Sequence, residues 1–144
     1  MFSKTCEYAL RAVIYIAQQS KQNQKVSFKQ IAKAIDAPES FIARILQDLS
    51  RRDVIQSAKG PTGGFFVNQQ SMNQSLADVV RVMDGDKLFV DCGLGLSYCS
   101  EKNPCPLHNE FKAIRANIQQ MLESATLGNF NDLLDQQQLF LGRS

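Results

Sequence analysis

The stretch SFKQIAKAIDAPESFIARILQDLSRRDVIQSAKGPTGGFFV, residues 27–67, decides the fold of this chain. Ser27 precedes a short helical segment and is suited to cap it, because its hydroxyl can accept a hydrogen bond from the first turn. Asp36 and Ala37 form a turn, and Pro38 fits the first position of a second helix, where a missing N–H costs nothing. Two short helices joined by a tight turn predict a helix-turn-helix motif.

Both predicted helices carry an apolar face at helical spacing. The face of the first helix consists of Phe28, Ile31, Ala32 and Ile35. In the second helix, residues 38–53, we expect burial of Phe41, Ile42, Ile45, Leu46 and Leu49.

The residues after the second helix predict a β-hairpin. Val54 and Ile55 begin its first strand, residues 65–67 form its second, and the turn GPTGG lies between them. This turn lacks the Lys-Ser/Thr ending and the strand-then-helix context of a nucleotide-binding loop. A hairpin directly after a recognition helix is the wing of a winged helix. The predicted fold is therefore mostly α with a small β-hairpin wing: a winged helix-turn-helix domain plus a long dimerisation helix.

Further helices flank this motif. Residues 4–19 and 75–85 have apolar residues at helical spacing, with Gly85 available as a C-cap. From about residue 106 a longer helix has a narrow apolar stripe, formed by Leu107, Phe111, Ile114, Ile118, Met121 and Leu122. Such a stripe resembles that of a coiled coil and favours pairing with a second copy of the chain. Thr126 is predicted to cap a last short helix through Phe130, Leu133 and Leu134.

A second informative stretch, DCGLGLSYCSEKNPCPLH, contains Cys92, Cys99, Cys105 and His108, the only histidine of the chain. Thiolate and imidazole favour iron–sulfur clusters, zinc or copper over hard cations. Glycines and prolines between these residues let a backbone wrap around a metal. Free cysteines are often small core residues, but the polar residues among these argue against burial in a core. The loop therefore predicts a metal or redox centre.

Length and charge limit the remaining possibilities. A chain of 144 residues is one domain, or a small domain with a helical arm. Residues 1–70 contain ten lysines and arginines against five acids, and residues 71–144 contain six against nine. A basic N-terminal half is typical of a nucleic-acid-binding surface. We divide the chain into a DNA-binding domain at 1–85, a cysteine-rich loop at 86–108, and a dimerisation helix with its tail at 106–144.

We expect a cytoplasmic protein with no membrane partner. The sequence has no apolar run near the roughly 20 residues that span a bilayer. The N-terminus carries Lys4, Glu7 and Arg11 and has no small-residue cleavage site, unlike a signal peptide. In the cytoplasm, clustered cysteines more often bind metal or act in redox chemistry than form disulfides.

Several strings resemble the Rrf2 family of winged-helix regulators, which includes the iron–sulfur regulators IscR and NsrR. They are SKTCEYALRAVIYIA, GPTGGFFV, LADVVRVMDG, the three-cysteine loop and TLGNFNDLL. The resemblance covers nearly the whole chain. It implies a cytoplasmic homodimer, a repressor, that binds a palindromic double-stranded DNA promoter site and carries an iron–sulfur cluster on three cysteines and a variable fourth ligand.

Two candidates match the family's fourth ligand. His108 matches the arrangement in IscR, and Glu7 of the partner subunit matches the acidic ligand of NsrR-like members. We favour His108, because it lies close in sequence to the cysteines and imidazole is a cluster ligand in Rieske centres. We accordingly favour [2Fe–2S] over [4Fe–4S], and expect that aerobic purification can remove the cluster. Cys6 matches no ligand of the family.

The motif also places the residues expected to contact DNA. The N-terminal end of the recognition helix enters the major groove, and basic residues near the wing hold phosphates. The predicted DNA-binding residues are Ser27, Pro38, Glu39, Ser40, Ala43, Arg44, Arg51, Lys59, Gly60 and Thr62. IscR-like members have an acidic residue at the position of Ala43, so their promoter preference does not transfer to this chain.

There are two alternatives to a cluster-binding regulator: the first keeps the DNA-binding module and the second discards it. A cluster-free regulator of the same fold would use the cysteines for structural zinc or for thiol oxidation, and Cys3His is a common zinc-binding set. A thiol-redox enzyme is disfavoured, because the sequence lacks a Cys-x-x-Cys pair near a βαβ pattern and an acid–base constellation beside His108. We therefore predict a regulator and not an enzyme.

Overall fold

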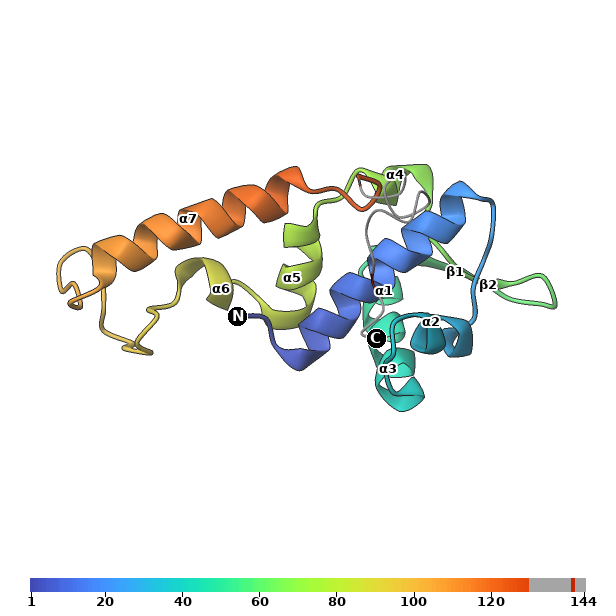
Figure 1. Cartoon of the computed structure of the whole chain (residues 1–144), viewed down its shortest axis with the longest axis horizontal. Helices are drawn as coiled ribbons and strands as arrows, with labels where there is room; N and C mark the ends of the chain where they lie inside the picture. Colours follow the sequence, from blue (N-terminus) through green and yellow to red (C-terminus); the bar gives the residue numbers. More distant parts are fainter. Residues whose placement is uncertain (130–140, 142–144) are drawn as a thin grey trace.

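The structure is a computed structural model that describes residues 1–129 and residue 141. The elements within those residues are α1 (Lys4–Lys21), α2 (Phe28–Ala34), α3 (Glu39–Arg51), β1 (Gln56–Ala58), β2 (Gly64–Phe66), α4 (Gln69–Met72), α5 (Leu76–Asp84), α6 (Lys87–Val90) and α7 (His108–Ser124). The mostly helical fold with a two-stranded hairpin is the one predicted. Figure 1 shows the hairpin and the cysteine loop at opposite ends of the molecule.

Helices α2 and α3 form the predicted helix-turn-helix. Ser27 caps α2 in a capping box: its hydroxyl accepts from the N–H of Gln30 at 3.2 Å, and its own N–H donates to Gln30 Oε1 at 2.8 Å. Asp36 makes the turn with φ of 55°. Pro38 is the N-cap of α3, not its first helical residue as predicted, because its ψ of 134° is extended. A proline tolerates both positions, since neither needs its N–H.

The apolar face of α3 is confirmed except at Phe41. Ile42, Ile45, Leu46 and Leu49 are buried against the rest of the domain. Phe41 is 56% exposed, so the prediction of its burial was wrong. The four buried residues already fill the inward side of the helix, and at 3.6 residues per turn Phe41 falls on its flank. Its ring there lies beside the ring of Tyr8, with the centroids 6.3 Å apart.

The hairpin begins later than predicted. β1 and β2 pair antiparallel in the register Gln56↔Phe66, Ser57↔Phe65 and Ala58↔Gly64. Val54 and Ile55 do not begin the strand; they are buried in the core before it. Both are large and apolar, so the core competes with the two-stranded hairpin for them. The base of the hairpin also pairs with Val26, which exchanges two backbone hydrogen bonds with Phe65.

Helix α1 lies at the centre of the core. Its buried side chains are Cys6, Tyr8, Ala9, Leu10, Ala12, Val13, Ile16 and Ala17. They contact α2, α3 and α5, and Figure 1 shows α1 crossing the middle of the domain. Such a helix is apolar around much of its circumference because it is covered on several sides. The predicted helix at 75–85 is confirmed as α5, with a Ser75 capping box and Gly85 as C-cap at φ of 69°.

Helix α7 contacts α5 and α6 and reaches from them to the cysteine loop, crossing α5 and not running along it (Figure 1). Its apolar stripe divides in two: Leu122 is buried in the core, whereas Ile114 and Met121 are 52% and 53% exposed. Ile118 lies between these sets and packs partly against the core. In the helix predicted from Thr126, residues 126–129 instead form a β-bridge with Ser75 and a turn, and the part from Phe130 through Leu134 lies outside the described residues. Short helices α4 and α6 and the buried Leu127 were not predicted.

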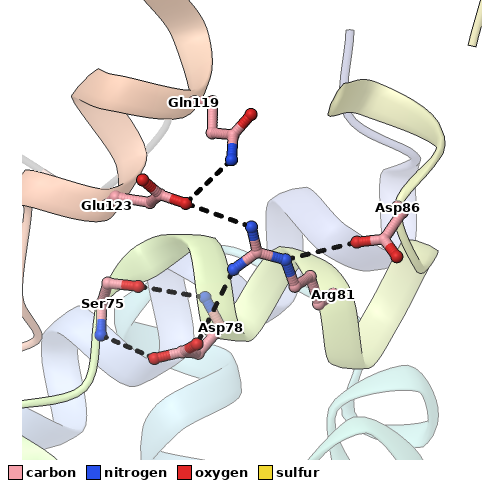
Figure 2. Close-up of polar contacts among 6 residues, drawn as sticks. All are labelled: Ser75, Asp78, Arg81, Asp86, Gln119 and Glu123. Carbon is pink, nitrogen blue, oxygen red and sulfur yellow. Dashed lines mark hydrogen bonds and ion pairs between the residues drawn. The ribbon is translucent and has the colours of Figure 1, made fainter. Parts of the chain in front are cut away.

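Arg81 of α5 joins three elements (Figure 2). Its guanidinium lies 3.3 Å from Asp86, 3.2 Å from Glu123 of α7 and 3.9 Å from Asp78. Gln119, one turn before Glu123, donates to the same carboxylate at 2.9 Å. The guanidinium also covers the ring of Phe89 in α6, with its central carbon 4.8 Å from the ring centroid. Arg81 therefore fastens α6 and α7 to the helix that packs against α1 and α3.

No helix among residues 1–129 is long and apolar enough to cross a membrane.

Arg81→Gln should loosen α7 while leaving the helix-turn-helix intact. We expect the free energy of unfolding to fall by about 1 kcal/mol, because the charges involved are partly exposed. Hydrogen–deuterium exchange measured by mass spectrometry should become faster in α7 and stay unchanged in α1 and α3. Arg51→Gln, which removes an exposed pair with Asp48, is the control. Unchanged α7 exchange in Arg81→Gln would contradict this account.

Candidate DNA-binding surface and metal centre

Most of the predicted DNA-binding residues lie in two groups, and Ser27 and Arg51 lie outside them. Pro38, Glu39, Ser40 and Arg44 are exposed at the N-terminal half of α3, where Ala43 is half-buried. Lys59, Gly60 and Thr62 are exposed in the turn between β1 and β2. Ser27 is exposed next to Val26, which pairs with the base of the hairpin. Arg51 is exposed at the far end of α3, 3.8 Å from Asp48.

The three cysteines of the loop converge. The sulfur atoms of Cys92, Cys99 and Cys105 all lie within 4.8 Å of one another, and those of Cys92 and Cys105 are 3.6 Å apart. Cys92 follows α6, and Cys105 precedes α7 by a single turn. The N–H of Cys105 donates to the sulfur of Cys99 at 3.3 Å, and the N–H of Leu94 donates to that of Cys92 at 3.4 Å. All four cysteines of the chain are free thiols.

His108 lies beside the cysteines as the first residue of α7. It is buried, and its Nδ1 lies 3.4 Å from the sulfur of Cys99. Its Nε2 points to the other side, 3.5 Å from Oε1 of Glu101. The four ligands predicted within one chain are therefore neighbours. Glu7 is exposed on α1, and its predicted role requires a second subunit.

The donor set fits a metal ion or an iron–sulfur cluster. A tetrahedral ion with metal–sulfur bonds of about 2.3 Å holds its sulfur ligands roughly 3.8 Å apart, close to the spacing of Cys92 and Cys105. Thiolates are the usual ligands of iron–sulfur clusters as well as of zinc. The three sulfurs lie together with Nδ1 of His108 beside them, so the donor set suits either group.

The thiols differ in how readily they ionise. Backbone N–H groups of Leu96 and Leu94 lower the pKa of Cys92 from 9.0 to about 7, because they stabilise the thiolate. Burial raises the pKa of Cys105. Burial, followed by the charge of Asp84, raises the pKa of Cys6 to about 12. Cys92 is therefore suited to bind a metal or react first at neutral pH.

Two contacts around the cysteines were not predicted from the sequence. Glu101 pairs with Lys112 of α7, and this contact, followed by that with His108, keeps the pKa of Glu101 below its usual range. Gly93 lies against the ring of Phe111, and a Cβ at this position would come within 2.4 Å of that ring. The sequence did contain a signal for Lys112. It lies four residues after His108, and residues so spaced share a helix face, so a contact of Lys112 near His108 could have been expected.

The fold and this loop together define a winged-helix DNA-binding regulator with a candidate metal centre. The chain belongs to the Rrf2 family: the family model, described as an iron-dependent transcriptional regulator, matches residues 2–133. The chain is thus a transcriptional regulator and not an enzyme.

Similar proteins agree with this assignment. The chain is 31% identical over 129 residues to an HTH-type transcriptional regulator of Aquifex aeolicus, covering 88% of each chain. It is 26% identical over 143 residues to the regulator IscR of Vibrio cholerae, covering 95% of this chain and 82% of that one. The solved structure of CymR, the global cysteine regulator of B. subtilis, has the same fold, with a TM-score of 0.75 at 20% identity over 92% of this chain and 96% of that one.

The pKa of Cys92 predicts a pH-dependent reactivity of the metal-free, reduced protein. A thiolate reacts with iodoacetamide and a thiol does not. Because its pKa is lowered, modification of Cys92 should rise through pH 7, whereas an ordinary thiol responds near its usual value of 9.0. Cys6 should stay unmodified until the protein unfolds, since it is buried. Peptide mass spectrometry separates the two sites; a midpoint for Cys92 near pH 9 would contradict the prediction.

Proposed function

We propose that the chain is a cytoplasmic, homodimeric repressor that binds palindromic double-stranded DNA, and whose DNA affinity depends on an iron–sulfur cluster at Cys92, Cys99 and Cys105. The observation that carries the proposal is the convergence of three thiols within 4.8 Å in a loop that leads directly into α7. When bound, such a cluster supplies a redox-active, labile centre. Its ligands are deprotonated thiolates, and the low pKa of Cys92 supports this role.

The fourth ligand is proposed to be His108. Its Nδ1 contacts the sulfur of Cys99, and the alternative, Glu7 of the partner subunit, needs a neighbour from a second chain. Imidazole replaces thiolate at [2Fe–2S] centres of the Rieske type, so three cysteines and one histidine favour [2Fe–2S] over [4Fe–4S]. Because Cys92 and Cys99 are only partly buried, aerobic handling should readily remove the cluster.

DNA binding is proposed to use these two groups together with Ser27 and Arg51. The N-terminal half of α3 presents Ser40 and Arg44 to base edges, with Pro38, Glu39 and Ala43 beside them. Arg51, Lys59, Gly60, Thr62 and Ser27 contact the backbone or the minor groove. Backbone contacts give affinity, and the few base contacts give sequence preference. A repressor of this kind acts by covering promoter DNA.

Dimerisation is proposed to occur through α7. Leu107, Ile114 and Met121 are exposed at intervals of seven residues, the spacing of a coiled-coil seam. Two α7 helices paired along this seam place two recognition helices on successive turns of the DNA. Since the cysteine loop precedes α7, ordering of the loop can alter the spacing of the recognition helices. In this proposal the DNA-binding domain spans residues 1–85, the cysteine-rich loop residues 86–108, and the dimerisation helix with its tail residues 106–144.

A second candidate is a regulator of the same fold that uses zinc or thiol oxidation. The 3.6 Å spacing of Cys92 and Cys105 favours it, because this distance suits ligands of one tetrahedral ion and brings two thiols close enough to react. Iron and sulfide analysis and visible absorbance separate the candidates. A cluster protein contains iron and sulfide and is coloured, whereas a zinc protein contains neither and is colourless.

Arg44→Ala and Lys59→Ala should weaken DNA binding differently. DNA selected from a random pool by the wild-type protein serves as the probe. Loss of Arg44 should lower affinity about tenfold or more and relax preference at one base, whereas loss of Lys59 should lower affinity on all sequences and reduce the salt slope by about 1. Lys87→Ala, at an exposed cation of α6, is the control. Unchanged DNA affinity and an unchanged salt slope in both variants would show that DNA binds at another surface.

Ile114→Glu should break the dimer, because a buried, unpaired charge in an apolar seam is costly. Ala116→Glu is the matched control, since two residues along a helix correspond to about 200° around it. Sedimentation velocity should show monomers for Ile114→Glu at concentrations where the control is dimeric. A dimer of wild-type stability in Ile114→Glu would place the interface elsewhere.

Each of Cys92→Ala, Cys99→Ala and Cys105→Ala should prevent cluster assembly under anaerobic reconstitution. His108→Cys should keep a cluster but lower its reduction potential, because thiolate is more electron-donating than imidazole. Glu7→Gln should change little if His108 is the ligand, and should make the cluster labile if the partner's acid fills that role. Absorbance, iron and sulfide content and redox titration measure these effects. Uptake of zinc but never of iron and sulfide would rule out the cluster.

A further inference from the structure

We propose that Glu101 is a positioning residue that directs Nδ1 of His108 toward the three cysteines, and that Lys112 holds the Glu101 carboxylate in place. This inference rests on the proposed metal centre, and it concerns residues outside the set of ligands.

The two ring nitrogens of His108 face different groups. Nδ1 lies 3.4 Å from the sulfur of Cys99, on the side of the cysteines. Nε2 lies 3.5 Å from Oε1 of Glu101, on the opposite side. An ionised carboxylate can only accept hydrogen bonds, so a partner of Glu101 must carry its proton on Nε2. The neutral ring then has its lone pair on Nδ1, directed at the thiols, which is the state that binds a metal.

The surroundings of Nε2 strengthen this assignment. Within the described residues, Nε2 is buried and makes no aligned hydrogen bond. A buried N–H without an acceptor is unfavourable, and buried polar groups in proteins nearly always find one. The side chain of His108 is only 10% exposed and has little room to turn, whereas that of Glu101 is 67% exposed. A small rotation of Glu101 therefore completes the hydrogen bond without moving the ring.

Lys112 explains how an exposed carboxylate stays in position. It lies four residues after His108 in α7, so both side chains emerge on the same face of the helix. Its ammonium forms an ion pair with the Glu101 oxygen that faces Nε2. The pair thus ties residue 101 of the loop to α7, which also carries His108.

A carboxylate on the remote nitrogen of a metal-binding histidine fixes the tautomer and the orientation of the ring. Removing such a partner typically costs 10- to 100-fold in metal affinity. The same loss is expected here, although Glu101 itself contacts no metal.

Zinc ions provide a direct test, because they need neither iron nor sulfide. His108 is the only histidine of the chain, so selective ¹⁵N labelling of histidine gives one imidazole whose shifts report which nitrogen binds. In the reduced wild-type protein we expect zinc on Nδ1 and a proton on Nε2. Glu101→Ala should lower zinc affinity about 10- to 100-fold, measured by competition with a chelator, and should let Nε2 bind in part of the molecules.

Two further variants separate positioning from a general effect on the loop. Glu101→Gln keeps an oxygen that accepts from Nε2 and should retain zinc on Nδ1, with most of the affinity restored. Glu110→Gln removes an exposed carboxylate from the first turn of the same helix and should match the wild type. Lys112→Met should fall between Glu101→Ala and the wild type in affinity.

The outcomes distinguish this inference from the proposed function. Wild-type affinity and Nδ1 binding in Glu101→Ala would overturn the inference and leave the metal centre intact. Zinc on Nε2 in the wild type, or no shift of the histidine on binding, would also overturn it. A wild-type protein that takes up neither zinc nor iron and sulfide would overturn both.

Discussion

At the junction of α5, α6 and α7, the guanidinium of Arg81 faces the carboxylates of Asp78, Asp86 and Glu123. Three carboxylates gathered around one cation repel one another if that cation is lost. Helix α5 also packs against α1 and α3. Arg81 therefore connects α6 and α7 to the domain that carries the recognition helix α3. The arrangement of α7, and with it the end of the cysteine loop that leads into α7, depends on this contact.

Backbone contacts reinforce the junction at the other end of α5. The N–H of Leu76 donates to the carbonyl of Ala125 at 2.8 Å, and the N–H of Leu127 donates to that of Gln74 at 3.0 Å. Leu127 is fully buried. Helix α5 is therefore bound to α7 near one end and to the segment after α7 near the other. Helix α5 in turn packs against α3, so a continuous set of contacts joins α7 to the recognition helix, as the proposed regulation requires.

The winged helix could be predicted from sequence because its signals are local: a capping box at Ser27, a turn at Asp36 and glycines in the hairpin. Phe41 was misassigned because helical spacing identifies an apolar side and cannot decide which residue on its edge is covered. Val54 and Ile55 were assigned to a strand because β-branched residues favour strands. The same side chains also suit a core, and spacing does not distinguish the two. Helices α4 and α6 are four residues long and too short to show a period.

The candidate ligands of the metal centre could be predicted from the sequence, but the residues that contact those ligands could not. Cysteine and histidine are rare in this chain, so their clustering stands out, whereas Glu101 and Lys112 resemble any exposed charges until the fold brings them together. Which nitrogen of His108 faces the sulfurs depends on the direction in which α7 begins. Residue spacing does not contain that information.

The contact between Gly93 and Phe111 separates the loop into a part that tolerates change and a part that does not. A Cβ at position 93 would enter the ring of Phe111, so any other residue there requires that ring to move. Leu94, Gly95, Ser97 and Tyr98 are exposed, in contrast, and lie between the first two cysteines. The N–H groups of Leu94 and Leu96 hold the sulfur of Cys92, whereas Ser97 and Tyr98 make no such contact within the described part of the chain, so these two exposed positions are a suitable place to attach a fluorescent or affinity label next to the cysteines.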